Sequence, residues 1–313
     1  MTSSGTPLTP KHGPESAANL AVVTGGTLTA ERPPEPPLSE ATGRPVQPAP
    51  PVRRTRRAPA GFLPLAVVAV AFLTLPLVAL VARAPWGSLP AALSAPGVLT
   101  ALRLSLICSL GAVGLSLLFG VPLAWLLARL RFRGRDVVRA VVLLPMVLPP
   151  VVGGVALLLA FGRNGLAGRW LDGLVGITLP FSTAGAILAE TFVAMPFLVI
   201  TVEAGLRGMD RRYEDAAATL GAGRWTTFRR VTLPLIAPSL GAGAALCWAR
   251  ALGEFGATIT FAGNLPGATQ TMPLAVYLAL QNNVDTAVTL SLVMLAISLV
   301  VLVGLRGRWF PSR

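Results

Sequence analysis

The chain has 313 residues, of which 53% are hydrophobic and only 12% are charged, and its mean hydropathy is +0.69. Soluble domains carry about 25% charged residues, so this composition excludes an ordinary soluble protein and predicts an integral membrane protein. The formal net charge of +13 comes almost wholly from arginine. Because the arginines cluster at the ends of apolar runs, the charge indicates membrane topology and lipid contact, with no nucleic-acid partner.

The first 60 residues are rich in Pro, Gly, Thr, Ser and Glu and poor in large apolar side chains. Such a segment cannot bury enough surface to fold alone, so we expect residues 1–60 to form a disordered cytoplasmic tail. The tail has no apolar stretch near Met1, which argues against a secretory signal. A regulatory or partner-binding role is the alternative.

Six apolar runs are each long enough to cross a bilayer, which requires about 20 residues. They are Phe62–Val81, Leu99–Leu127, Ala140–Phe161, Thr183–Ala204, Ala237–Phe261 and Thr286–Leu305. The sequence therefore predicts an all-α membrane protein. Its parts are a first helix with an outer loop (61–98), a core of five helices (99–305) and a short cytoplasmic end (306–313).

The positively charged residues divide unequally between the two sides of these spans. Of the 26 Lys and Arg, 21 lie in the tail, in the loops after the second and fourth spans, and at the C-terminal end. Four lie on the opposite side, and Arg250 lies inside the fifth span. Cytoplasmic loops carry the excess of positive charge, so both termini and the loop of residues 207–234 are expected in the cytoplasm.

The third span contains three prolines, Pro145, Pro149 and Pro150, followed by Gly153 and Gly154. Proline frees backbone carbonyl groups, which in lipid must be satisfied by neighbouring helices or by water in a cavity. We therefore interpret this span as a kinked helix that lines a translocation pathway. A kink needed only for packing is the alternative.

Two charged residues, Arg250 and Glu254, lie four positions apart in the fifth span. On one face of a helix they are able to pair, and charges at this depth face protein or water. We expect Arg250 to offer positive potential to an anion while Glu254 holds its side chain. A structural pair that fixes helix packing is the alternative. Glu190 in the fourth span is a further buried acid whose partner the sequence does not identify.

The outer loop after the fifth span has no charged residue between Glu254 and Asp285. Asn264, Thr269 and Gln270 instead offer neutral hydrogen-bond donors. Such donors suit brief contact with an oxyanion that must also leave, so these residues are candidates for the pathway. A turn that packs against the mouth of the bundle is the alternative.

The polar segment Tyr213–Pro234, which reads YEDAAATLGAGRWTTFRRVTLP, has an internal pattern. The composition of Arg211–Leu220 predicts a short helix, and Gly221 suits the sharp turn that ends it. A second short helix is expected over Arg224–Arg230, with Pro234 ending it. Small side chains at helical spacing on the first helix suit insertion into a groove on a partner protein.

The spacing of this segment resembles the EAA loop of bacterial ABC importer permeases. Asp215 replaces the usual glutamate and Val231 the usual isoleucine, while every spacing is kept. The resemblance implies that the loop docks into a cytoplasmic ATPase subunit and couples it to the membrane helices. The implied coupling residues are Glu214, Asp215, Ala216, Ala217, Gly221, Val231, Leu233 and Pro234.

Three further runs, Ala249–Thr258, Gly263–Gly267 and Thr269–Tyr277, are similar to the molybdate branch of the molybdate/sulfate ABC permease family. The resemblance covers Leu99–Leu305 and implies a type I importer fold. It also implies a homodimer, two ATPase subunits that use ATP-Mg, and an extracytoplasmic molybdate-binding protein. For the chain itself it implies no catalytic residue, no bound cofactor and no metal.

The sequence has no Walker A motif, which ends in Gly-Lys-Ser or Gly-Lys-Thr, because the single lysine, Lys11, is followed by His12. ATP-driven transport would therefore need an ATPase on another chain. Cys108 and Cys247 lie in apolar runs without metal-ligand spacing, and we interpret both as packing residues.

Three other functions compete with molybdate import. The same machine with sulfate, thiosulfate or tungstate as cargo is the first. A proton-coupled secondary transporter is the second, with Glu190 and Glu254 as relay candidates, and it leaves the Asp215–Pro234 spacing unexplained. A membrane enzyme is the third, and no His, Cys or carboxylate cluster with catalytic spacing supports it.

Overall fold

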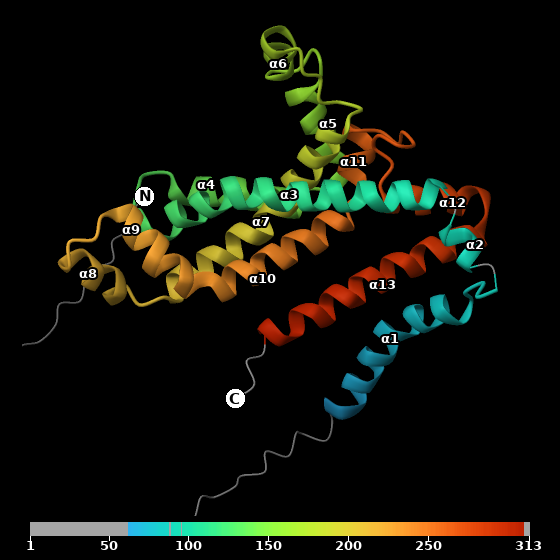
Figure 1. Cartoon of the computed structure of the whole chain (residues 1–313), viewed down its shortest axis with the longest axis horizontal. Helices are drawn as coiled ribbons and strands as arrows, with labels where there is room; N and C mark the ends of the chain where they lie inside the picture. The colour runs from blue at the N-terminus through green and yellow to red at the C-terminus, as the bar shows by residue number, and fades with distance from the viewer. Residues whose placement is uncertain (1–61, 88, 95, 310–313) are drawn as a thin grey trace, which may run out of the picture. The chain divides into compact units, whose positions relative to one another are not determined.

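The computed structural model describes residues 62–87, 89–94 and 96–309, so the predicted disordered tail lies outside the described residues. The described residues form helices joined by short connections, with no β-strand among them (Figure 1). The helices are α1 (Phe62–Ala82), α2 (Leu89–Leu93), α3 (Pro96–Arg129), α4 (Arg135–Val147), α5 (Pro150–Phe161), α6 (Gly168–Val175), α7 (Thr183–Gly208), α8 (Arg212–Thr219), α9 (Arg224–Thr227), the π-helix η1 (Phe228–Thr232), α10 (Leu233–Leu252), α11 (Gly256–Phe261), α12 (Met272–Asn282) and α13 (Val284–Trp309).

Five stretches of the described chain are long and apolar enough to cross a membrane. They are α1, α3, α7, the continuous stretch from α9 to α10, and α13. The pair α4 and α5 passes the same test only when the two helices are taken together. The structure therefore agrees with the predicted number of apolar runs, but it divides two of them.

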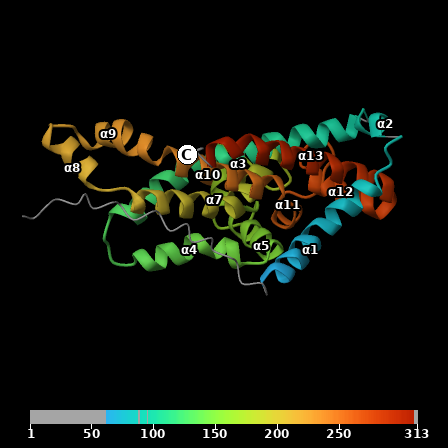
Figure 2. The ribbon, with the colours of Figure 1, turned by 90° about the horizontal axis from the view of Figure 1, so that it is seen from below.

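The core of the bundle is formed by α3, α7 and α10, which lie side by side in Figures 1 and 2. Their contact surfaces combine alanines with larger aliphatic side chains. Leu127 and Leu198 are fully buried, and Ala112 and Ala194 lie in the same cluster. Small residues at such surfaces let helix backbones approach closely, which is how helices associate in a membrane without a hydrophobic driving force between them.

Helix α1 differs from this core because none of its residues is buried. Its side chains are apolar all round, and in a membrane such a helix turns most of its surface to lipid. Helices α12 and α13 pack on each other and form a small cluster with the start of α3 around Ala101, Met272 and Leu290.

The third predicted span is not one helix. Helices α4 and α5 meet at an angle of 119°, and the break falls at Leu148 and Pro149. Both residues have extended backbone, with ψ of 137° and 133°. Each precedes a proline, and the proline ring disfavours helical geometry for the residue before it. The kink expected over 140–161 is therefore present, and it is a complete break into two helices at the prolines that the sequence identifies.

The fifth predicted span is also divided. Helix α10 begins at Leu233, stops at Leu252, and is followed after three residues by the short helix α11. Thus Arg250 lies in the last turn of one helix and Glu254 in the break before the next. The prediction that both residues share one continuous helix was wrong, but the pair itself forms, as described below.

Candidate functional site

The coupling segment, residues 207–234, forms the helix–turn–helix that the sequence predicts. Helix α8 ends at Thr219, and Gly221 follows with φ of +82°. This left-handed backbone favours glycine because a side chain there is strained. Asp215 and Ala216 are exposed and Ala217 is half-buried. The small side chains of α8 that are expected to enter a partner groove therefore lie at the surface, with Ala217 partly covered.

The second half of the segment departs from the prediction. Helix α9 runs without interruption through η1 into α10, so Pro234 does not end a helix. It lies in the first turn of α10, directly after the π-turn of η1, so the continuous helix passes through this proline. Val231 and Leu233 are half-buried at this junction. A single π-turn between a surface segment and a membrane helix is an arrangement often found at functional sites.

Helix α8 is tied to two membrane helices through Glu214. Its Oε1 atom lies 3.2 Å from Nη2 of Arg129, at the end of α3. The same oxygen accepts a hydrogen bond of 2.7 Å from the Thr232 hydroxyl, at the end of η1. The sequence places Glu214 in the coupling segment but does not reveal either partner, since both depend on how distant helices pack.

Aromatic side chains add an exposed apolar surface to this end of the bundle. The ring of Trp225 is 71% exposed and stacks on Phe228 with the ring centroids 5.7 Å apart. The neighbouring Leu220 is 88% exposed. A groove of about 370 Å³ lies beside the rings, lined by Pro122, Trp125, Arg224, Trp225 and Phe228. Sequence reasoning missed these rings, although two tryptophans and a phenylalanine close to a polar loop were a usable signal.

The Arg250–Glu254 pair spans the break between α10 and α11. Glu254 Oε2 lies 2.7 Å from Nη2 of Arg250, and Glu254 Oε1 accepts a hydrogen bond of 2.8 Å from the backbone N–H of Ala257. Glu254 is 1% exposed, and the Arg250 side chain keeps partial access to the surface. Glu254 therefore both neutralises Arg250 and satisfies a free N–H at the start of α11, as the structural alternative expects.

The two broken spans contact each other. A Cβ atom at Gly154 of α5 would lie 2.6 Å from Cβ of Thr260 and 2.9 Å from the backbone oxygen of Ala257, both on α11. Only glycine fits so close an approach. Of the predicted pathway prolines, Pro145 lies inside α4, while Pro149 and Pro150 start α5. Irregular backbone at membrane depth is tolerated where protein buries it or where it lines a cavity, so the meeting of these breaks remains a candidate pathway region.

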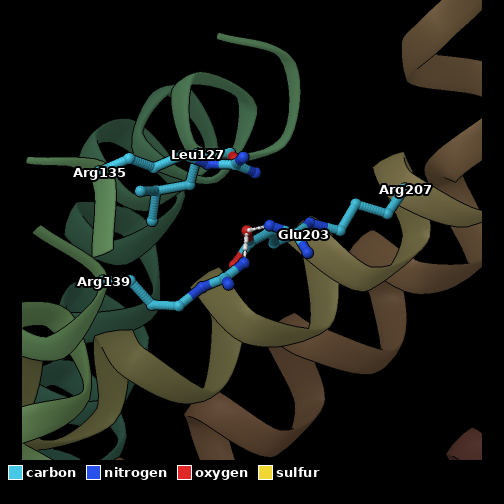
Figure 3. A network of polar contacts seen from close by, with 5 residues as sticks. All are labelled: Leu127, Arg135, Arg139, Glu203 and Arg207. Carbon is cyan, nitrogen blue, oxygen red and sulfur yellow. Dashed lines mark hydrogen bonds and ion pairs between the residues drawn. The ribbon is translucent and has the colours of Figure 1, made fainter. Parts of the chain in front are cut away.

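A second charged network, which sequence reasoning missed, joins α4 to α7 (Figure 3). The carboxylate of Glu203 pairs with Arg139 on α4 and, at 2.8 Å, with Nη2 of Arg207 one turn along α7. Arg135 donates a hydrogen bond to the backbone oxygen of Leu127 on α3. A pocket of about 350 Å³ beside Glu203 is otherwise lined mainly by aliphatic side chains. These contacts add to the packing of α4, which has no fully buried residue and meets the core through the half-buried Val138 and Val142.

Glu190, the buried acid of α7, is 1% exposed, and its Oε2 atom has no hydrogen-bond partner among the described residues. Ala186 and Ala189, on the same stretch of α7, lie in two apolar clusters of the bundle, and Glu254 lies close enough to Glu190 for an electrostatic interaction. A buried oxygen without a partner is uncommon in folded proteins.

The outer-loop candidates have mixed surroundings. Thr269 is buried, and its hydroxyl accepts a hydrogen bond of 2.9 Å from the backbone N–H of Leu265. Asn264 and Gln270 are half-buried, and the Asn264 Oδ1 atom has no hydrogen-bond partner within the described part of the chain. In this conformation Thr269 stabilises a turn. A role of these three residues in the pathway stays a prediction.

Comparison with known proteins gives this arrangement a context. A family model described as "Binding-protein-dependent transport system inner membrane component" matches residues 120–313. The Molybdenum transport system permease protein ModB of Mycobacterium tuberculosis is 47% identical over 247 residues, which cover 79% of this chain and 93% of that protein. The protein of the same description from Escherichia coli is 44% identical over 209 residues, covering 67% of this chain and 91% of that protein.

The Sulfate transport system permease protein CysT of Escherichia coli is also similar, with 41% identity over 185 residues that cover 59% of this chain and 66% of that protein. Among solved structures, a bacterial ABC transporter involved in the import of the acidic polysaccharide alginate superposes with a TM-score of 0.64 at 20% identity. The match covers 81% of this chain and 95% of that one. At this identity the likeness concerns the fold.

Proposed function

This chain belongs to the family of binding-protein-dependent transport system inner membrane components, and we propose that it is the permease subunit of an ATP-driven importer of molybdate. The observation that carries the choice of cargo is the 47% identity to a molybdenum permease over 79% of this chain. The sulfate permease matches a smaller share of the chain, 59%, at 41% identity.

In this proposal the energy comes from a separate chain. The sequence lacks a Walker A motif, so ATP-Mg is bound and hydrolysed by two partner ATPase subunits. The surface offered to them is the exposed face of α8 with Asp215 and Ala216, followed by the left-handed turn at Gly221. Both termini and this surface face the cytoplasm, which the distribution of arginine supports.

The permease acts as a homodimer, with the pathway between the two copies. An extracytoplasmic binding protein delivers the anion to the side opposite α8 and thereby sets most of the specificity. Closure of the ATPase dimer moves α8, and the bundle alternates between states open to each side. Within each bundle the partly exposed Arg250 supplies positive potential, and Asn264, Thr269 and Gln270 supply neutral donors.

The test is uptake by the purified permease in vesicles. The permease, its ATPase and its binding protein are reconstituted together, ATP is enclosed on the ATPase side, and radioactive molybdate is added outside. We expect uptake that requires all three proteins and ATP. Uptake by the permease alone, driven by a pH gradient, would instead support a secondary transporter.

Sulfate import is the second candidate, because the sulfate permease shares 41% identity with this chain. Unlabelled molybdate, tungstate, sulfate and thiosulfate are therefore added in turn as competitors of labelled molybdate. We expect molybdate and tungstate to compete at similar concentrations, since both are tetrahedral dianions of similar size. Stronger competition by sulfate or thiosulfate than by molybdate would assign the chain to sulfate uptake.

A further inference from the structure

We propose that Glu214 is a positioning residue that ties α8 to both α3 and α10, so that one movement of α8 is passed to two membrane helices. This inference rests on the proposed function, because it assumes that a partner ATPase moves α8. Among the described residues, every side-chain hydrogen bond or ion pair between α8 and another helix runs through Glu214.

The tie to α3 is an ion pair with a poorly solvated arginine. The Arg129 side chain is only 9% exposed, and its Nε and Nη2 atoms are buried without a hydrogen bond to any residue that the structure describes. Among the described residues, Glu214 is the one acid within ion-pair distance of it. A buried cation depends on such a partner much more than an exposed one does. Arg129 therefore holds α8 firmly against the end of α3.

The tie to α10 is a hydrogen bond at the π-turn. Thr232 is 1% exposed, ends η1, and directly precedes the first residue of α10. Its hydroxyl donates to the same Glu214 oxygen that faces Arg129. One carboxylate oxygen is thus shared by the ends of two membrane helices. A contiguous chain of this kind is able to carry a displacement between distant elements.

The two ties are separable by substitution. Glu214→Gln removes the charge that Arg129 needs but keeps an oxygen that accepts from Thr232. Thr232→Val keeps the shape of the side chain and the ion pair but removes the hydroxyl. Asp172→Asn is the matched control, because it removes a carboxylate from an ion pair with Arg163 at 3.6 Å on a different surface of the molecule.

The experiment measures ATP hydrolysed per molybdate transported, in vesicles with the ATPase and the binding protein. The amount of assembled complex and its melting temperature are measured on the same samples. A residue that only stabilises the fold lowers these two quantities and leaves the ratio unchanged. We expect the ratio of ATP hydrolysed to molybdate transported to rise about five-fold in Glu214→Gln and in Thr232→Val. A factor of about five is the lower end of the usual range for coupling between two sites. We expect Asp172→Asn to match the wild type.

An unchanged ratio in either variant overturns the proposal that α8 is tied to both helices. If Glu214→Gln does not assemble, Arg129→Gln tests the tie to α3 in its place, with the same expected rise. Wild-type vesicles distinguish a failure of the proposed function from a failure of the proposed role of Glu214. Absence of ATP-dependent uptake of molybdate or sulfate by the wild type contradicts the proposed function, whereas uptake by the wild type with unchanged ratios in the variants overturns only the role of Glu214.

Discussion

Glu254 and Arg250 form an ion pair of 2.7 Å across a break between two helices, and the pair holds both helix ends in place. The second carboxylate oxygen of Glu254 accepts the N–H of Ala257, so one buried side chain stabilises the last turn of α10 and the first turn of α11. Positive charge near the C-terminal end of α10 is also favoured by the helix dipole. The break is therefore stabilised by the Arg250–Glu254 pair and by the hydrogen bond from Ala257.

Replacing Glu254 by glutamine should destabilise the protein or lower its transport. The amide still accepts from Ala257, but Arg250 loses its neutralising charge. We expect the free energy of unfolding to fall by about 2 kcal/mol. This is less than the usual cost of breaking a fully buried pair, because Arg250 keeps part of its access to water. The measurement is thermal unfolding in detergent, with Asp172→Asn as the surface-pair control. A melting temperature equal to that of wild type would show that the pair contributes nothing.

Replacing Gly221 by valine should uncouple ATP hydrolysis from transport while the protein still inserts. A β-branched residue is strained at φ of +82°, so the turn after α8 shifts and the exposed face of α8 that meets the ATPase is misplaced. Asparagine tolerates the left-handed region much better, so Gly221→Asn is the matched control. The test compares ATP hydrolysis with molybdate uptake in the same vesicles. Normal uptake by the valine variant would contradict a docking role for the turn.

Replacing Gly154 by alanine should loosen the contact between the broken spans. The added methyl group would lie 2.6 Å from Cβ of Thr260, so α5 and α11 must move apart. Overpacking of this kind costs about 1–3 kcal/mol. Gly241→Ala on α10 is the control, since its new Cβ meets nothing within 4 Å. Equal melting temperatures of the two variants would mean that α5 and α11 adapt without cost.

The two ends of the bundle should be labelled from opposite sides of the membrane. Both native cysteines, Cys108 and Cys247, are buried, so single added cysteines report their own position. Leu265 and Leu220 are exposed positions in the outer loop and after α8. In intact cells a membrane-impermeant maleimide should label Leu265→Cys, and it should reach Leu220→Cys only after permeabilisation. The reverse pattern would overturn the predicted orientation.

Replacing Glu203 by glutamine should free α4. Arg139 and Arg207 then lose their shared acid, and only half-buried residues such as Val138 and Val142 still pack α4 against the core. We expect faster hydrogen exchange across α4, measured by mass spectrometry. Arg207→Gln keeps the Arg139–Glu203 pair and should leave the exchange of α4 close to wild type. Unchanged exchange in the Glu203 variant would mean that this network does not hold the helix.

Much of the candidate coupling surface was predictable because its signals are local. The composition of Arg211–Leu220 predicted α8, and Gly221 predicted the left-handed turn that follows it. The prediction that Pro234 ends a helix was wrong. Proline is found both after the end of a helix and in the first turn of one, so the residue type alone does not separate the two positions. Only the continuous path through η1 shows that Pro234 lies in the first turn of α10.

The sequence by itself determined which segments are able to cross the membrane, because an apolar run of about 20 residues is long enough to span the hydrocarbon core. It also determined the predicted orientation, through the placement of arginine, and the spacing of the coupling segment. Only the tertiary structure decided where the fifth span breaks and which partners Glu214 and Glu203 take. Those outcomes depend on contacts between residues far apart in the chain, and a linear pattern of side chains contains no distance between helices.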